Sequence, residues 1–180
     1  MNPVTEVNFV RVDPHNTDLR ALVDQLDKDL KSRYPHEMIY GVDFSDPKVQ
    51  EMTFVVAYQN ERAVGCGALR PLDPQSSIME LKRFYVDPGS RKQGIASRML
   101  QDLEARAIAA GCGEIRLETG IKQPESIALY LKHGYQPIDL FGPYIGDPDS
   151  MCYGKKPASA KARDSGVILA RWGVQYPFQH

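Results

Sequence analysis

The stretch from Phe84 to Leu100, FYVDPGSRKQGIASRML, constrains the fold most, because it reads as a strand, a turn and a helix in direct succession. The apolar run stops at DPGS, a group of residues typical of turns. A helix is predicted over residues 94–110, with its apolar side formed by Ile95, Met99, Leu100, Leu103 and Ala107. A strand that leads straight into an amphipathic helix indicates a sheet covered by helices.

The remaining segments extend this pattern in both directions. Strands are expected at residues 7–12, 53–59, 63–72, 78–86, 114–119, 135–141 and 150–156. Two further helices are expected, one from Thr17 to the RYP stop and one from Pro124 through Leu131. Residues 34–50 show no clear period and are expected to form a short helix or a loop. The order predicts an α/β fold in which a mixed sheet, with an antiparallel meander over residues 53–86, carries helices on both faces.

The chain is expected to hold one domain followed by a tail. Its 180 residues suit a single core, which we place at residues 1–156. Residues 157–180 begin with the linker-like PASAKARDSG and end with the apolar VILARWGVQYPF, which holds the only tryptophan. This tail could dock on the core, pack across a homodimer or remain disordered.

Charge and composition narrow the choice of partners and location. The net charge of -1 and a pI near 6.4 give no basic field that would attract nucleic acid. No apolar run approaches the roughly 20 residues of a membrane helix, and the first ten residues lack a signal-peptide pattern, so a cytoplasmic location is expected. Cys66, Cys112 and Cys152 have no metal-ligand spacing and small or apolar neighbours, which predicts buried, unreactive thiols and no metal site.

The turn before the second helix could bind an anion. The first backbone N–H groups of a helix lack partners, and its dipole makes that end electropositive. Gly94 and Ala96 would let a pyrophosphate approach the backbone, and Arg91 and Lys92 would add charged contacts. The alternative is that Gly94 relaxes a loop and the two cations are solvated. The sequence has neither a P-loop nor a Rossmann glycine motif.

Two motifs in order resemble the GNAT superfamily, the acyl-CoA-dependent N-acyltransferases. The first consists of Val86, Asp87, Pro88, Arg91, Gly94 and Ala96, and the second of Gln123, Ser126, Leu129, Tyr130, Gly134 and Tyr135. The resemblance covers residues 53–155. It departs from the family pattern at Gln123, where asparagine is usual, at Ser126, where alanine is usual, and at Tyr135, where phenylalanine is usual. It implies a GNAT-like, mostly antiparallel sheet of six to seven strands.

The resemblance also implies acetyl-CoA as the co-substrate and places its contacts. The strand at residues 78–86 is implied to part from the next strand and to hold the pantetheine arm through backbone groups of Phe84, Tyr85 and Val86. The implied pyrophosphate contacts are Arg91, Lys92, Gln93, Gly94, Ile95 and Ala96. Gln123, Ser126 and Tyr130 are the implied cofactor contacts of the second motif.

Acyl transfer to an amine sets three requirements, and the resemblance supplies a candidate for each. The amine must lose a proton, the thioester oxygen must be stabilised and the leaving thiolate must be protonated. A backbone N–H near Val86 is the implied oxyanion donor, and Tyr130 is the implied acid, with packing of its ring into the core as the alternative. Glu80 lies six residues before Val86, so strand alternation predicts that both side chains share a face. Glu80 is the first candidate base, with a structural or substrate-binding role as the alternative, and Glu118 is the second candidate.

His133 is instead expected to act as a cation in the last helical turn. The acceptor is expected to be a primary amine of a small molecule or peptide, acetylated by direct transfer. Its binding is assigned to the first helix, to residues 34–44 and to residues 141–150. Carboxylates there would suit a cationic amine, and tyrosines could equally wall an apolar or aromatic pocket; these are Glu37, Asp43, Asp147, Asp149, Tyr34, Tyr40 and Tyr144.

Two alternatives to an enzyme remain open from the sequence. One is a non-catalytic GNAT-fold module that binds or senses acyl-CoA. The other is a small-molecule-binding domain unrelated to CoA.

Overall fold

The structure is a computed structural model that describes residues 5–35, 39–73, 75 and 77–158. The expectations for Glu37 and for residues 159–180 of the tail fall outside these ranges. No helix within the described residues is long and apolar enough to cross a bilayer.

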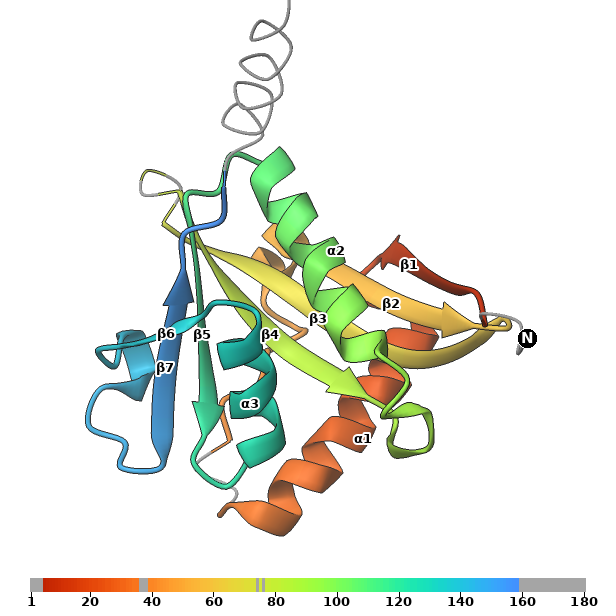
Figure 1. The fold of residues 1–180 in the computed structure, drawn as a ribbon, viewed down its shortest axis with the longest axis horizontal. Helices are drawn as coiled ribbons and strands as arrows, with labels where there is room; N and C mark the ends of the chain where they lie inside the picture. The colour runs from red at the N-terminus through yellow and green to blue at the C-terminus, as the bar shows by residue number, and fades with distance from the viewer. Residues whose placement is uncertain (1–4, 36–38, 74, 76, 159–180) are drawn as a thin grey trace, which may run out of the picture.

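One sheet of seven strands forms the centre of the molecule (Figure 1). The strands lie in the order β1-β2-β3-β4-β5-β7-β6, and only β4 and β5 are parallel neighbours. Their bounds are Val7–Val12 (β1), Thr53–Gln59 (β2), Arg62–Asp73 (β3), Ile78–Val86 (β4), Glu114–Gly120 (β5), Gln136–Ile138 (β6) and Ser150–Lys155 (β7). The predicted meander corresponds to β2-β3-β4. The predicted mixed, mostly antiparallel sheet is therefore confirmed.

Three α-helices form where the sequence predicts them: α1 (Thr17–Arg33), α2 (Ile95–Ala109) and α3 (Pro124–Lys132). Asn16 caps α1 by accepting a hydrogen bond from the Leu19 amide at 3.0 Å. Pro124 starts α3 at a position where its missing N–H has no cost. Single 3-10 turns lie at Pro47–Glu51 (η2), Pro88–Ser90 (η3) and Gly142–Tyr144 (η4).

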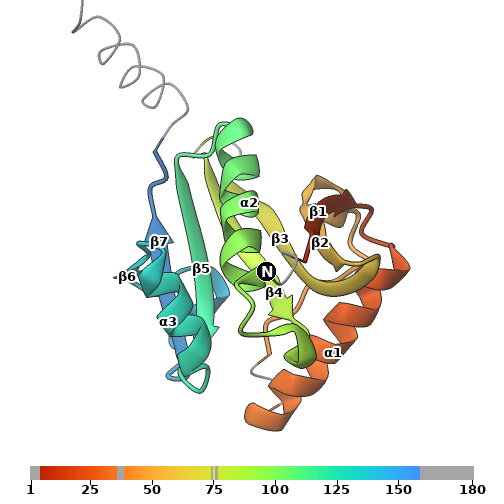
Figure 2. The ribbon, with the colours of Figure 1, turned by 45° about the vertical axis from the view of Figure 1, so that its right-hand side comes forward.

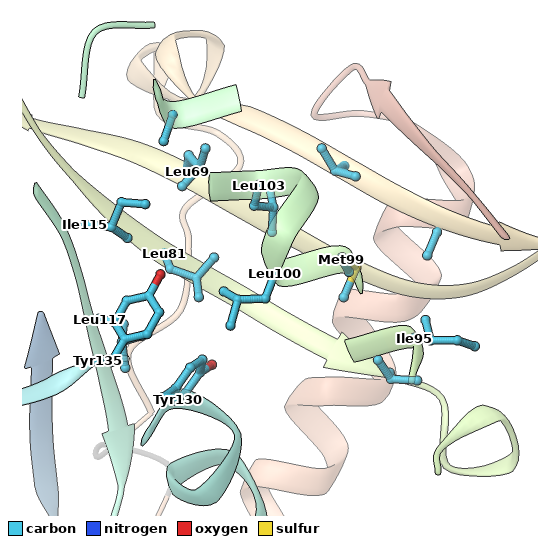
Figure 3. Close-up of a cluster of buried hydrophobic side chains, with 14 of the residues drawn as sticks. Leu69, Leu81, Ile95, Met99, Leu100, Leu103, Ile115, Leu117, Tyr130 and Tyr135 are labelled. Carbon is cyan, nitrogen blue, oxygen red and sulfur yellow. The ribbon is translucent and has the colours of Figure 1, made fainter. Parts of the chain in front are cut away.

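Helices cover both faces of the sheet, as predicted. Along β2, Phe54 and Val56 pack in the cluster that contains α1, whereas Val55 and Ala57 pack in the cluster that contains α2 and α3. The alternation follows from the period of two residues in a strand. Figure 2 shows α1 on one side of the sheet and α2 and α3 on the other, and Figure 3 shows the cluster between α2 and the sheet.

The strands that follow α3 differ from the prediction in length and in order within the sheet. The predicted strand over residues 135–141 is paired only at Gln136–Ile138, and the chain then turns through η4. β7 lies between β5 and β6, so β6 is an edge strand and can accommodate Pro137.

The three cysteines are buried and free, as the sequence predicts. Burial raises the pKa of Cys66 to about 12 and that of Cys152 to about 11. None of them is therefore a reactive thiolate at neutral pH.

Candidate active site

A fork between the two parallel strands is the central feature of the site. β4 and β5 pair from Ile78–Glu114 to Leu81–Leu117, and the pairing then ends. Beyond that rung the strands separate toward their carboxyl ends (Figure 1). Backbone groups of β4 that would otherwise bond to β5 are available in this opening. The predicted parting of the two strands is therefore confirmed.

A β-bulge shapes the β4 side of the fork. β3 pairs Cys66 with Tyr85 and then Ala68 with Lys82, so Gly67 lies opposite two residues of β4. One of these two, Arg83, has a positive φ of 52°. Such an extra residue reverses the alternation of side chains along the strand.

The bulge overturns one prediction. Leu81 and Val86 both pack in the cluster on the α2 side of the sheet, although they are five positions apart and a regular strand would place them on opposite faces. Glu80 precedes Leu81 and therefore projects toward the α1 side. The prediction that Glu80 and Val86 share a face is wrong, because it assumed an unbroken strand.

The first cavity is a groove of about 430 Å³ that runs from α1 across β4 to α3. Eight of the predicted cofactor contacts line it: Phe84, Tyr85, Val86, Arg91, Lys92, Ala96, Gln123 and Ser126. The Arg91 side chain is oriented by a 2.8 Å hydrogen bond from its Nε to the Val86 carbonyl and lies 5.5 Å from the Tyr85 ring centre. Its remaining guanidinium N–H groups are donors suited to a phosphate.

The start of α2 at this groove fits a pyrophosphate. Gly94 precedes the helix with a φ of 77°, and a Cβ atom built there would meet nothing within 4 Å. No side chain caps α2 and no acidic residue lies in its first turn, in contrast to α1. The helix dipole and the first N–H groups therefore face the groove without an acidic side chain from the first turn of α2 itself.

Other predicted cofactor contacts lie beside the groove. The Gln93 side chain accepts a 2.9 Å hydrogen bond from Gln59, and Ile95 packs into the core. The buried Ile95 could meet a ligand only through its backbone, whereas the exposed Gln93 side chain keeps its amide N–H donors. Tyr130 lines the adjoining cavity instead.

This second cavity, of about 90 Å³, lies at the fork and shares Phe84, Gln123 and Ser126 with the groove. It brings together both predicted catalytic residues, Glu80 and Tyr130, with Glu118. Its other lining residues include Tyr40, Lys82, Arg83, Thr119 and Tyr144.

Tyr130 is buried beside Tyr135, with ring centres 5.8 Å apart (Figure 3). The ring centre of Phe84 lies 6.2 Å from that of Tyr130. Burial raises the pKa of its phenol above the ordinary value, and the nearby Glu118 acts in the same direction. The hydroxyl therefore holds its proton at neutral pH. The alternative of ring packing is observed, and the residue also lines the cavity, so its predicted role as the acid stays a prediction.

Glu118 lies on β5 one residue beyond the last paired rung. Burial raises the pKa of its carboxyl to about 7, although a 2.8 Å hydrogen bond from Ser150 Oγ and the charge of Lys82 lower it. The charges of Asp147 and Glu80 raise it further. A carboxyl with this pKa exchanges its proton near neutrality, which is what a general base requires.

Glu80 is held very differently. It is 1 % exposed, and both of its oxygens are engaged by donors, one by the Arg70 guanidinium and the other by the Tyr144 hydroxyl. Lys82 Nζ lies 3.9 Å from the same carboxylate and donates to the Tyr144 hydroxyl at 3.0 Å. These contacts leave Glu80 little freedom to accept a proton from a substrate.

The sequence analysis did not single out Arg70 or Lys82, and it included Ser150 only as the last residue of the acceptor segment 141–150. Arg70 and Ser150 reach the site only through the strand register and the η4 loop, which the sequence does not reveal. Lys82 had a signal, because it is a lysine inside the apolar run IMELKRFYV, where a charge is costly unless it has a role.

A third cavity, of about 50 Å³, opens beside Glu118 and is lined by Tyr34, Tyr40, Asp147 and Asp149 among others. The Tyr40 hydroxyl donates to the Asp147 carboxylate at 2.8 Å. These four predicted acceptor residues are therefore brought together. Asp43 lies elsewhere, where its carboxylate accepts from the Ser45 amide at 2.9 Å.

His133 lies away from these cavities, at the carboxyl end of α3 as predicted, with Nε2 3.0 Å from Ser97 Oγ. Within the described residues, no cluster of three His, Cys, Asp or Glu side chains has the geometry of a metal site.

A family model supplies the observation that decides the family. The model described as the Acetyltransferase (GNAT) family matches residues 19–135, which include the groove, the fork and α3. The chain belongs to this family. The GNAT match covers both sequence motifs and confirms the resemblance drawn from them.

Individual relatives agree with this. The chain is 36 % identical to a protein of Azospirillum brasilense named IAA acetyltransferase, over 81 % of this chain and 94 % of that protein. It is 31 % identical to the uncharacterised N-acetyltransferase YsnE of Bacillus subtilis, over 68 % of this chain and 81 % of that protein.

Solved structures share the fold. A Klebsiella pneumoniae protein assigned to the acyl-CoA N-acyltransferases matches with a TM-score of 0.71 and 32 % identity, over 83 % of this chain and 97 % of that chain. A GNAT acetyltransferase from Elizabethkingia anophelis, solved with acetyl-CoA bound, matches with a TM-score of 0.62 and 17 % identity, over 84 % of this chain and 98 % of that chain.

Proposed function

We propose that this GNAT protein transfers the acetyl group of acetyl-CoA directly to the primary amine of a small molecule. The observation that carries the proposal is the fork, because it joins a groove suited to CoA on one side to a buried base and acid on the other. The cavities past the fork measure about 90 and 50 Å³, which suits a small acceptor better than a folded protein. The name of the Azospirillum relative also supports a small-molecule acceptor.

The groove residues would bind and orient the co-substrate. Arg91, Lys92 and the start of α2 would hold the pyrophosphate. Backbone groups of Phe84 and Val86 would hold the pantetheine arm in the opening of the fork, where β5 no longer pairs with β4. The thioester would then lie at the fork, beside Tyr130 and Glu118.

The reaction would proceed by attack of the amine on the thioester carbonyl. Glu118 would accept the proton of the amine as the new C–N bond forms, and a free β4 N–H near Val86 would stabilise the negative oxygen. When the C–S bond breaks, Tyr130 would give its proton to the departing CoA thiolate. Solvent would return a proton to Tyr130 and remove one from Glu118. Glu80 would act as a positioning residue that holds Tyr144 and Lys82 in place.

Two measurements on the purified protein test the proposal. Acetyl-CoA at 100 times its Kd should raise the unfolding free energy by about 2.7 kcal/mol, detected as a higher melting temperature. Release of CoA thiol should depend on adding a small primary amine. A thermal shift without thiol release across a broad amine panel would favour a module that binds acyl-CoA without catalysis, and no thermal shift would remove the basis of the proposal.

A further inference from the structure

Lys82 is a buried cation at the fork for which the acetyl-transfer steps have no use. It is 7 % exposed and lines the same cavity as Glu118 and Tyr130. An ammonium has three N–H donors. Among the described residues, the Tyr144 hydroxyl at 3.0 Å is its one hydrogen-bond acceptor, and Glu80, at 3.9 Å, is the one carboxylate within ion-pairing distance. Lys82 therefore has unused donors directed at a cavity.

Lys82 and Glu118 occupy equivalent positions on the two arms of the fork. Each follows the last paired rung, Leu81–Leu117, by one residue. Leu81 and Leu117 both pack toward α2, so Lys82 and Glu118 project from the opposite face, toward α1. No ion pair within 4.0 Å joins these two side chains in the described structure. A buried ammonium and a partly buried carboxyl on adjacent strands, with no direct ion pair between them, leave room for a group that complements both.

Lys82 has no direct ion-pair partner of its own among the described side chains. Glu80 already has the Arg70 guanidinium as a direct partner. Arg83 is paired with Asp27 of α1. Two cations, Arg70 and Lys82, therefore share Glu80, and the carboxyl of Glu118 acts on Lys82 only from beyond ion-pairing distance. The ammonium can therefore bind the carboxylate of a substrate while Glu118 serves as the base.

We propose that the acceptor is a free α-amino acid, with its amine at Glu118 and its carboxylate at Lys82. This inference rests on the proposed acetyltransferase function and names its substrate class. The two strands lie about 4.8 Å apart at the last paired rung and separate beyond it, and the flexible stem of Lys82 can span the added distance. The two groups of an α-amino acid are joined by a single carbon, so both can be met across the opening. The side chain would extend to the mouth beside Asp147 and Asp149, which disfavours acidic side chains.

The test compares acceptors that differ only at the carboxylate. CoA thiol release is measured with phenylalanine, phenylalaninamide and phenethylamine, with lysine and cadaverine, and with glutamate. The free amino acids should show a kcat/KM at least about tenfold above their amides and decarboxylated amines, which is the effect of one charge-assisted hydrogen bond. Glutamate should be the poorest of the amino acids.

Variants of Lys82 test whether this residue causes the preference for acceptors with a free carboxylate. Lys82→Met should raise KM for the amino acid about tenfold or more and leave the Kd of acetyl-CoA unchanged, and Lys82→Arg should recover part of the loss. Lys28→Met, at an exposed position of α1, should behave as wild type. If Lys82→Met does not fold, the acceptor series on the wild type still decides the question.

Equal or better use of the amides and decarboxylated amines would overturn the proposal while leaving the acetyltransferase function in place. An equal loss of activity toward both classes in Lys82→Met would also overturn it. If acetyl-CoA binds but no acceptor releases thiol, the proposed function itself fails, and the amino-acid proposal fails with it.

Discussion

Replacing Glu118 with glutamine should change the pH dependence of stability in a direction that the structure fixes. Folding raises the pKa of this carboxyl from 4.5 to about 7, mainly by burial. Below about pH 4.5 the Glu118 carboxyl is neutral in both the folded and the unfolded state, so it does not lower the unfolding free energy. As the pH rises from 4.5 to 7, the unfolded chain ionises first, so the wild type loses up to about 3 kcal/mol of unfolding free energy.

Glutamine carries no charge at any of these values of pH, so Glu118→Gln should lack this loss. The unfolding free energy of the variant, relative to wild type, should therefore rise by up to about 3 kcal/mol between pH 4.5 and 7 and stay constant above that. Urea titrations at a series of pH values measure it. Glu51→Gln, at an exposed glutamate, is the control and should show no such trend.

The same variant should lose activity for the same reason. The wild-type kcat/KM should climb as the pH rises through about 7, when Glu118 becomes able to accept a proton. Glu118→Gln should be slower by about 10²- to 10⁴-fold and should lack this rise. A variant that keeps the wild-type rate, or a stability difference that is flat from pH 4.5 to 8, would refute the assignment of Glu118 as a buried base.

Three further substitutions probe separate parts of the site. Tyr130→Phe should lower kcat by tenfold or more in thiol-release assays, whereas the Kd of acetyl-CoA from calorimetry should not change. Lys92→Ala should raise KM for acetyl-CoA with little change in kcat, and added salt should narrow its difference from wild type. Gly120→Ala should lower the melting temperature, with a cost of about 1–3 kcal/mol, because the new Cβ would lie 2.0 Å from the Tyr34 hydroxyl. A melting temperature equal to wild type would show that this contact can relax.

The order of the elements could be predicted because hydrophobic period and turn residues agree along most of the chain. The helix expected from Thr17 and the boundary at Gly94 rest on local signals, and the structure confirms both. The position of β7 between β5 and β6 could not be predicted, since it depends on how the chain crosses after α3. No local pattern records which strands become neighbours.

The site was predictable to the extent that it lies in one continuous segment. The groove residues from Phe84 to Ala96 follow one another in the sequence, so a single motif located them. The general base could not be located in this way. Whether Glu80 or Glu118 is suited to the role depends on the bulge at Arg83 and on the hydrogen-bond partners of each carboxylate. Glu80 and Glu118 are alike in sequence, and only burial and hydrogen bonding separate a fixed carboxylate from one that titrates near neutrality.

Direct acetyl transfer at the fork is tested by a single-turnover reaction with isotope-labelled acetyl-CoA and a free amino acid, followed by mass spectrometry. Direct transfer predicts that the labelled N-acetyl product and CoA thiol appear at the same rate and in equal amounts, while the mass of the protein does not change. Thiol release without labelled product, or a protein that gains the mass of an acetyl group before the product appears, would contradict direct transfer at the fork.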